Sequence, residues 1–342
     1  MRKVRTQPLS QDPTNLNQQE EASLTPFAFV FPGQGSQSVG MLDRWAGHPA
    51  VAQAVQEASE ALGQDIGSLI QHGPKEDLAL TTNTQPVMLV AGVAAFRVWM
   101  AEVGVPPAYV AGHSLGEYAA LVASGALTLT QAAPLVRFRA QAMQDAVPVG
   151  AGAMAAILGL DASKIIALCQ GITLATDQYG LKSGEVVEAV NFNDPMQTVI
   201  AGSKAAVDKA CELLKAAGAK RALLLQVSAP FHSSLMKPAA EKLQQKLADT
   251  SFAALQIPLI NNIDVAIETD TARIRNALYR QAFGAVRWVE CVQAMKARGI
   301  HHIVECGPGK VLAGLAKRID VDLTGTALFD IASLAQAKEI LA

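Results

Sequence analysis

The run Tyr109-Val-Ala-Gly-His-Ser-Leu-Gly116 decides the fold of this chain. Its first four residues form a short apolar stretch typical of a buried strand, and a helical pattern follows from Glu117 to Ala126. Between them, residues 112–116 match G-x-S-x-G, in which a sharp strand-to-helix turn exposes a serine. An ordinary turn of small residues looks similar, but the strand and helix on its two sides favour a nucleophile at Ser114.

Two further apolar runs have the same form. Residues 27–31 end at Pro32-Gly33, and residues 302–306 end at Gly307-Pro-Gly309. Helical patterns lie between these runs. Strands that alternate with helices predict an α/β fold with a mainly parallel sheet.

The middle of the chain has a different pattern. Its elements follow the order β-α-β-β-α-β, which is that of a ferredoxin-like unit. A turn is expected at Asn193-Asp-Pro195, between the second and third strands. The expected strands span 153–159, 186–192, 198–202 and 221–227, and the expected helices span 161–169 and 204–217.

We therefore expect two subdomains and a tail. A large α/β subdomain spans residues 26–149 and 227–342, and a small ferredoxin-like subdomain, residues 150–226, is inserted into it. Residues 1–25 are polar and lack the apolar core of a signal peptide. A transit peptide is a weaker alternative, since this segment contains Glu20 and Glu21. We expect residues 1–25 to be a disordered extension of a cytoplasmic protein.

Composition limits the classes of function. Half of the 342 residues are hydrophobic and 17% are charged, so the chain can bury a large core. The formal net charge of −2 provides no broad electrostatic footprint for nucleic acid. The longest apolar stretch, Val87 to Ala101, is interrupted by Arg97 and is too short to cross a bilayer. We therefore expect neither nucleic acid nor a membrane as a partner.

The four cysteines are scattered along the chain, without a C-x-x-C pair or a paired histidine spacing. This spacing argues against a zinc site and against a disulfide framework. We expect no metal, and four buried thiols in a reducing compartment, at Cys169, Cys211, Cys291 and Cys306.

A nucleophilic serine needs a base, and the chain has six histidines. His232 lies in the loop Ser-Ala-Pro-Phe-His, where the large subdomain resumes, and is the best placed. His113 is next to Ser114 in the turn, so its side chain should point away from the hydroxyl. The others lie in loop-like settings or begin an apolar strand: His48, His72, His301 and His302.

Several motifs, in their order along the chain, resemble those of malonyl-CoA:acyl carrier protein transacylases. The likeness covers nearly all of residues 26–342, and the motifs together are far more specific than any one alone. It implies a hydrolase-like large subdomain that carries the ferredoxin-like insert. The motifs are Phe31-Pro-Gly-Gln-Gly-Ser-Gln37, Gly112-His-Ser-Leu-Gly-Glu117, Arg139 in Arg-Ala-Gln-Ala-Met-Gln144, Phe231-His232 before Ser-Ser-Leu-Met-Lys-Pro238, Gln281 in Arg-Gln-Ala-Phe, and Glu305-Cys-Gly-Pro-Gly309.

The resemblance implies a role for each matching catalytic residue. Ser114 would be the nucleophile, and His232 would act as general base and acid. A backbone carbonyl near Gln281, in place of an aspartate, would orient the imidazole. The N–H groups of Gln34 and Leu115 would form the oxyanion hole.

The resemblance also implies that Arg139, Gln281 and Phe231 bind the substrate. Arg139 would hold the malonyl carboxylate, because a planar guanidinium can bind a carboxylate through two hydrogen bonds. From the residues alone, Arg139 beside Arg137 is better explained as a surface arginine. Phe231 would narrow the pocket near the substrate α-carbon and so favour malonyl over methylmalonyl.

The implied activity transfers a malonyl group from malonyl-CoA to the phosphopantetheine thiol of acyl carrier protein, through an ester on Ser114. The kinetics would be ping-pong, and the product would supply malonyl units for fatty acid synthesis. We expect a monomer without a cofactor, whose partners are malonyl-CoA, coenzyme A and the carrier. Scattered basic residues could meet an acidic carrier, but a solvated surface is the simpler explanation: Lys204, Lys209, Lys215, Lys220, Arg221 and Lys237.

Three alternatives share parts of this pattern. A thioesterase would use the same serine and histidine but would have no use for Arg139. A transferase of the same chemistry could serve a polyketide synthase or a malonate decarboxylase, and the residues do not separate these cases. A carrier-binding module without activity is disfavoured by the presence of Ser114, His232 and Arg139 together.

Overall fold

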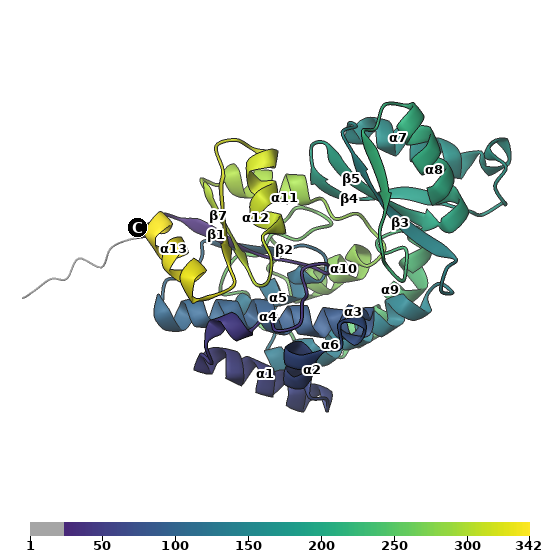
Figure 1. The fold of residues 1–342 in the computed structure, drawn as a ribbon. Helices are drawn as coiled ribbons and strands as arrows, with labels where there is room; N and C mark the ends of the chain where they lie inside the picture. Colours follow the sequence, from purple (N-terminus) through teal and green to yellow (C-terminus); the bar gives the residue numbers. More distant parts are fainter. Residues whose placement is uncertain (1–23) are drawn as a thin grey trace, which may run out of the picture.

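A computed structural model, which describes residues 24–342, contains two separate sheets (Figure 1). The first sheet is parallel, with the strand order β2-β1-β7-β8. This confirms the α/β fold with a mainly parallel sheet. The strand β8 at its edge was not expected from the sequence. The strands are β1 (Phe27–Phe31), β2 (Tyr109–Gly112), β7 (His302–Cys306) and β8 (Thr324–Leu328).

Helices cover both faces of this sheet, which explains why β1 is buried along its whole length. Phe27, Phe29 and Phe31 pack into one core cluster, while Ala28 and Val30 pack into another. In Figure 1, α4, α5 and α6 lie on one side of the sheet, and α11 and α12 lie on the other. These helices span Thr81–Glu102 (α4), Gly116–Ala123 (α5), Leu129–Asp145 (α6), Trp288–Lys296 (α11) and Val311–Ile319 (α12).

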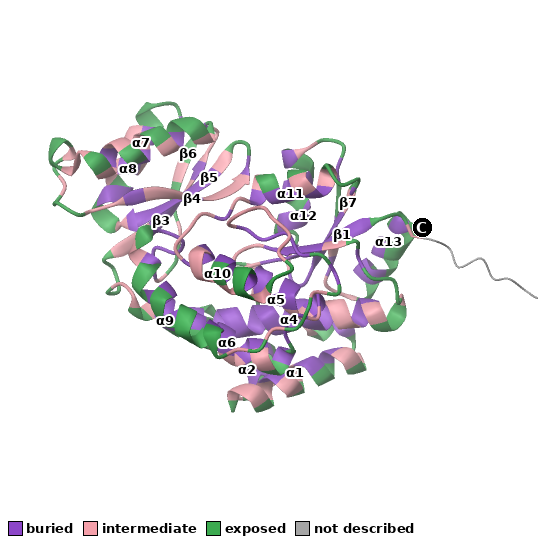
Figure 2. Cartoon of the chain, turned by 180° about the vertical axis from the view of Figure 1, so that it is seen from behind, coloured by how far each residue is buried: buried purple, intermediate pink, exposed green. Residues whose placement is uncertain are grey.

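Helix α4 is longer than the apolar stretch in the sequence suggested. It spans 22 residues and has the length and composition of a membrane-crossing helix. However, 78% of its most apolar window is buried inside the protein, and Figure 2 shows most of it in the colour of buried residues. The expectation that this apolar segment is too short to cross a bilayer was therefore wrong, because the helix extends beyond the stretch from Val87 to Ala101. Packing in the core explains the apolar composition of α4.

The remaining helices of the larger part surround this core. Helix α5 ends three residues before the expected Ala126, because Gly125 adopts a left-handed conformation with φ of 79°. The others span Pro49–Leu62 (α1), Ile66–His72 (α2), Lys75–Ala79 (α3), Lys237–Ala248 (α9), Thr271–Gln281 (α10) and Ile331–Leu341 (α13), with short 3-10 helices at Asp43–Trp45 (η1) and Ser234–Met236 (η3).

The second sheet is antiparallel, with the order β4-β5-β3-β6. The order β-α-β-β-α-β along the chain confirms the ferredoxin-like unit. Residues of α7 and α8 form its core together with the sheet. The elements are β3 (Gly152–Leu158), α7 (Ala162–Leu174), η2 (Thr176–Tyr179), β4 (Val187–Asp194), β5 (Gln197–Ser203), α8 (Lys204–Ala216) and β6 (Arg221–Leu224).

Several boundaries in this unit differ from the prediction, and the largest difference is in α7, which continues to Leu174 beyond the expected end at Cys169. Strand β4 continues to Asp194, so the turn lies at Pro195-Met196 instead of residues 193–195. Strand β6 ends at Leu224, before the expected Val227, because the N–H of Val227 turns back to the carbonyl of Leu225.

The first described residues already pack against the rest of the chain. Leu24 contacts the large core, and the N–H of Thr25 donates to the carbonyl of Leu341 in α13 at 2.7 Å. These two residues were expected in the disordered extension but are packed. The expectation for residues 1–23 lies outside the described part of the chain.

Candidate active site

The G-x-S-x-G turn places Ser114 directly after the carboxyl end of β2, where α5 begins. Its glycines permit close packing: a methyl group added at Gly112 would lie 1.8 Å from the carbonyl carbon of Gly116. One added at Gly116 would lie 2.0 Å from the carbonyl oxygen of Phe31. Ser114 itself has a φ of 54°, a strained conformation for a residue with a side chain.

His232 contacts the serine from the loop after β6. Its Nε2 lies 2.7 Å from Ser114 Oγ, and its Nδ1 lies 2.8 Å from the carbonyl oxygen of Gln281. Because a carbonyl only accepts, Nδ1 carries the proton and Nε2 is free to accept from the serine hydroxyl. Within residues 24–342, no carboxylate is bonded to this ring. His232 also has a positive φ, of 67°.

The electrostatic surroundings keep this imidazole neutral. Burial and, to a lesser extent, the nearby Arg139 cation together lower the pKa of His232 to about 3. A neutral imidazole at physiological pH is the form that can accept a proton.

Arg139, on α6, is buried with 2% of its surface exposed. Its Nη1 donates to Gln85 Oε1 at 2.7 Å, and its Nη2 donates to Gln281 Oε1 at 3.1 Å and to Ser114 Oγ at 3.2 Å. Its Nε has no partner among the described residues. The alternative of a surface arginine is therefore wrong, and burial lowers the pKa of Arg139.

Gln281, at the end of α10, is completely buried and connects three groups of the site. Its Oε1 accepts from Arg139, while its Nε2 donates to the carbonyl of Ser114 at 2.9 Å and to Glu117 Oε2 at 3.1 Å. Both ends of the amide are thus occupied within the protein. Gln281 therefore fixes the positions of Arg139 and of the Ser114 backbone.

Asn262 fixes the backbone of the turn and was not found from the sequence. Its Oδ1 accepts from the N–H of Ser114 at 2.8 Å, and its Nδ2 donates to the carbonyl of Gly112 at 2.7 Å. Its own N–H donates to Glu117 Oε2 at 3.0 Å. One amide therefore holds both sides of the strained serine. The only signal in the sequence was a pair of asparagines after the apolar residues 257–260.

The predicted oxyanion-hole residues, Gln34 and Leu115, lie on two different loops of the same site. Leu115 caps α5, so its N–H is at the positive end of the helix dipole. The side chain of Gln34 donates to Thr81 Oγ1 and accepts from Gln85 Nε2, each at 3.2 Å. In the part of the chain that the structure describes, neither main-chain N–H donates to another residue. Gln85 links this loop to Arg139, and the sequence analysis did not find it.

Phe231 precedes His232 and packs into the large core cluster, with 8% of its surface exposed. A cavity of about 560 Å³ reaches His232 between α7, β4 and the loop after α10. Phe231 is not among the residues that line this cavity. His113 points to the insert, where its Nε2 lies 2.8 Å from Asn193 Oδ1, as expected for a side chain directed away from Ser114.

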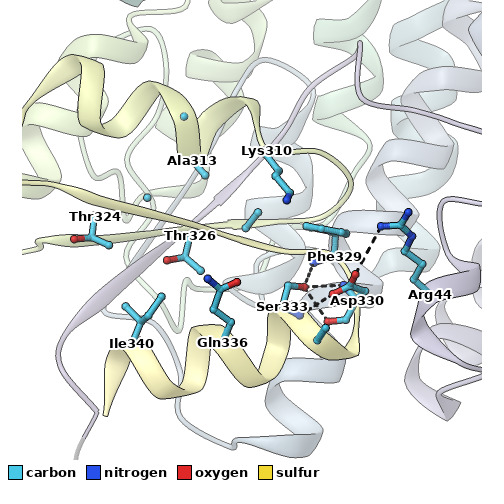
Figure 3. Close-up of a pocket in the computed structure, with 14 residues that line it drawn as sticks. Arg44, Lys310, Ala313, Thr324, Thr326, Phe329, Asp330, Ser333, Gln336 and Ile340 are labelled. Carbon is cyan, nitrogen blue, oxygen red and sulfur yellow. Dashed lines mark hydrogen bonds and ion pairs between the residues drawn. The ribbon is translucent and has the colours of Figure 1, made fainter.

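A separate cavity of about 640 Å³ lies along the edge strand β8, against α13 (Figure 3). We call it the β8 groove; it includes Arg44, Lys310, Thr326, Phe329 and Asp330. Figure 3 shows Arg44 directed toward Asp330, with which it forms an ion pair at 3.9 Å. None of the predicted site residues lies there.

The cysteines take no part in the site. Cys169, Cys291 and Cys306 are buried, whereas Cys211 is only half-buried, which corrects the expectation of four buried thiols. Burial raises the pKa of all four thiols. Residues 24–342 contain no cluster of three or more His, Cys, Asp or Glu side chains that could hold a metal ion.

Comparison with known proteins agrees with this geometry. The acyl transferase domain family matches residues 28–318. The fold, the serine turn and this match define an acyltransferase.

The chain is 51% identical to the malonyl CoA-acyl carrier protein transacylase of Escherichia coli K12, over 93% of this chain and 100% of the relative. It belongs to the family of malonyl CoA-acyl carrier protein transacylases, which confirms the resemblance seen in the motifs.

Solved structures support the same assignment. The acyl-carrier-protein S-malonyltransferase of Burkholderia pseudomallei is 59% identical, with a TM-score of 0.88 over 92% of this chain and 100% of that one. A malonyl-transacylase in complex with a type II PKS acyl-carrier protein is 48% identical, with a TM-score of 0.88 and coverage of 92% and 100%.

Proposed function

We propose that the protein transfers a malonyl group from malonyl-CoA to the phosphopantetheine thiol of acyl carrier protein, through an ester on Ser114. The observation that carries the proposal is the position of the serine oxygen. Ser114 Oγ lies 2.7 Å from a neutral imidazole nitrogen and 3.2 Å from a buried guanidinium. The relatives in E. coli and B. pseudomallei carry names for the same reaction.

In the first half-reaction, His232 Nε2 accepts the proton of Ser114 while the serine oxygen attacks the thioester carbonyl. The carbonyl oxygen becomes negative and would be stabilised by the N–H groups of Gln34 and Leu115, each worth about 3–4 kcal/mol. As this intermediate collapses, the thiolate of coenzyme A leaves and takes the proton from His232. The carrier thiol then reverses these steps and receives the malonyl group.

Arg139 is the residue that would select a substrate with a carboxylate. Its buried Nε without a partner among the described residues supports a second hydrogen bond to a planar acid. An acetyl group has no carboxylate and would gain no hydrogen bond or charge interaction with the Arg139 guanidinium. Gln281 would position Arg139, and Phe231 would restrict the pocket near the α-carbon.

The proposal also covers the organisation of the chain and its cellular role. We propose that residues 150–226 form a small subdomain inserted between the segments 26–149 and 227–342, which carry the catalytic groups. The protein would act in the cytoplasm, as a monomer without a cofactor, in fatty acid synthesis. One relative is bound to a type II PKS acyl-carrier protein. Transfer rates to a fatty acid synthesis carrier and to a PKS carrier would therefore distinguish the two pathways.

Mass spectrometry of the intact protein after exposure to malonyl-CoA tests the proposal. We expect one added malonyl group on the peptide that contains Ser114, and none in Ser114→Ala, which lacks the nucleophile. The adduct should disappear when the carrier is added, with malonyl appearing on the carrier. Free malonate without carrier acylation would instead identify a thioesterase.

A further inference from the structure

Two buried side chains of opposite charge lie on either side of Gln281. Arg139 donates to one end of its amide at 3.1 Å, and Glu117 accepts from the other end at 3.1 Å. Both side chains are buried, with 2% of each residue exposed. A buried cation is strongly destabilising unless an anion compensates it. In the free protein Glu117 is the carboxylate placed to do so.

A malonyl group on Ser114 would change this balance, because its carboxylate would pair with Arg139 directly. The site would then hold two carboxylates and one guanidinium in a buried region of low dielectric constant. We propose that Glu117 is a proton-linked counter-ion of the malonyl site, which binds a proton from solvent when Ser114 becomes malonylated. This inference rests on the proposed function, and it makes Glu117 a positioning residue that acts through Gln281 and Arg139.

The surroundings of Glu117 allow this change of charge. Burial raises the pKa of Glu117 to about 7, while Arg139 and hydrogen bonds from Asn262 and Gln281 oppose the shift. The negative charge of Asp264, which pairs with Arg280, also raises the pKa of Glu117. The Tyr118 phenol, next to Glu117 in the chain, interacts with the same carboxylate. The Cys291 thiol, on α11, also interacts with Glu117.

A second acidic side chain lies close to this carboxylate. Glu117 and Glu268 line the same small cavity between α5, α10 and the loop before α10. The side chain of Glu268 is 20% exposed, so it is the more accessible of these two carboxylates.

The proposal predicts how malonylation depends on pH. Below pH 7 Glu117 is already protonated in the free protein, so no proton is taken up and the equilibrium is unaffected by Glu117. Above pH 7 each malonylation takes up a proton, so the equilibrium constant for malonyl transfer to Ser114 falls by up to about tenfold per pH unit. The ionisation of the coenzyme A thiol affects every variant equally and cancels in a ratio.

The test measures the malonylated fraction of the intact protein by mass spectrometry, at fixed malonyl-CoA and coenzyme A, from pH 6 to 8.5. Glu117→Gln keeps an acceptor for Asn262 and Gln281 but cannot titrate. We expect its equilibrium constant to match that of the unmodified protein at pH 6 and to exceed it by about 30-fold at pH 8.5. A constant ratio over this range would overturn the proposal.

Glu305→Gln is the matched control. Glu305 is buried, and burial likewise raises its pKa to about 7, but its carboxylate accepts from the N–H of Ala313 at the start of α12. Since it contacts none of the proposed catalytic groups in the described chain, Glu305→Gln should keep the pH dependence of the unmodified protein. The same loss of pH dependence in Glu305→Gln would contradict a specific role for Glu117.

A second measurement protects the test if Glu117→Gln does not fold. In the unmodified protein, the equilibrium constant for malonyl-CoA divided by that for acetyl-CoA should fall about tenfold per pH unit above pH 7, because an acetyl group brings no second carboxylate. A flat ratio would reject the role of Glu117. Absence of any malonyl adduct on Ser114 would instead reject the proposed function itself, so the two failures are distinguishable.

Discussion

The site around Ser114 and the β8 groove both contain charged side chains, but they differ in how far their polar groups already have partners. In the β8 groove Arg44 is paired with Asp330, and Lys310 Nζ lies over the ring of Phe329 at 5.1 Å. Around Ser114, the N–H groups of Gln34 and Leu115 and the Nε of Arg139 have no partner within residues 24–342. Fixed donors that still lack an acceptor therefore distinguish the proposed catalytic region from the β8 groove.

The largest effect that would sharpen this comparison is expected from Arg139→Ala. Removing the guanidinium should lower kcat/KM for malonyl-CoA by about 10²–10³-fold, since the malonyl carboxylate would be buried without a partner. Transfer from acetyl-CoA should be affected much less, so the preference shifts toward acetyl. Steady-state rates with both donors measure this shift.

Lys310→Ala is the control in the β8 groove. It removes a cation that already has a partner, and we expect rates with malonyl-CoA within about twofold of the unmodified protein. Equal loss with both donors in Arg139→Ala, or a large loss in Lys310→Ala, would break the distinction between the two regions.

A smaller effect is expected from Asn262→Ala, which removes the two hydrogen bonds that the Asn262 side chain makes to the Ser114 turn. A misplacement of the serine by about 1 Å should lower kcat by about 10²-fold, with little change in KM. Asn261→Ala is the matched control, because Asn261 is also buried but its side chain accepts only from the N–H of Asp264. Similar losses in the two variants would mean that the loop, and not the Asn262 amide, supports the site.

The smallest effect concerns pH. The rate of Ser114 malonylation should fall less than about twofold between pH 7.5 and pH 5.5, because His232 has a pKa of about 3 and stays neutral. A base with the ordinary pKa of about 6.5 would lose about tenfold at pH 5.5. Stopped-flow or quenched-flow experiments measure this fall in rate at low pH. In Arg139→Ala the rate should begin to fall at a higher pH, since the cation no longer lowers the pKa of His232.

The same shift has a consequence for stability. A histidine whose pKa is lower in the folded state contributes no pH dependence above its unfolded pKa of about 6.5. Below that value the unfolded chain binds a proton that the folded site excludes, so the free energy of unfolding falls as pH drops from about 6.5 toward 3.

The sequence predicted those parts of the molecule that local pattern determines. The strands β1, β2 and β7 have the expected bounds, because each is an apolar run that ends in a glycine loop. The turn around Ser114 was found for the same reason. The choice of His232 needed more than local pattern, and its position relative to Ser114 became visible only in the fold.

The residues that the sequence did not reveal act across long separations. Asn262 and Ser114 are 148 positions apart, and Gln85 and Arg139 are 54 apart. The local sequence around a polar residue does not indicate which distant residue it will bond, so these contacts follow only from tertiary packing. Strand β8 was missed because its first residues, Thr324 and Gly325, are exposed at the sheet edge and lack an apolar pattern.

The hydrogen bond between Thr25 and Leu341 brings both ends of the described chain together at α13, far from the insert in Figure 1. Attachment of the protein to a bead or an electrode near either end should therefore leave the region around Ser114 and His232 accessible to the proposed acyl carrier protein. A short linker between these ends, with new ends cut in an exposed loop, should likewise give a permuted enzyme with its reaction centre intact.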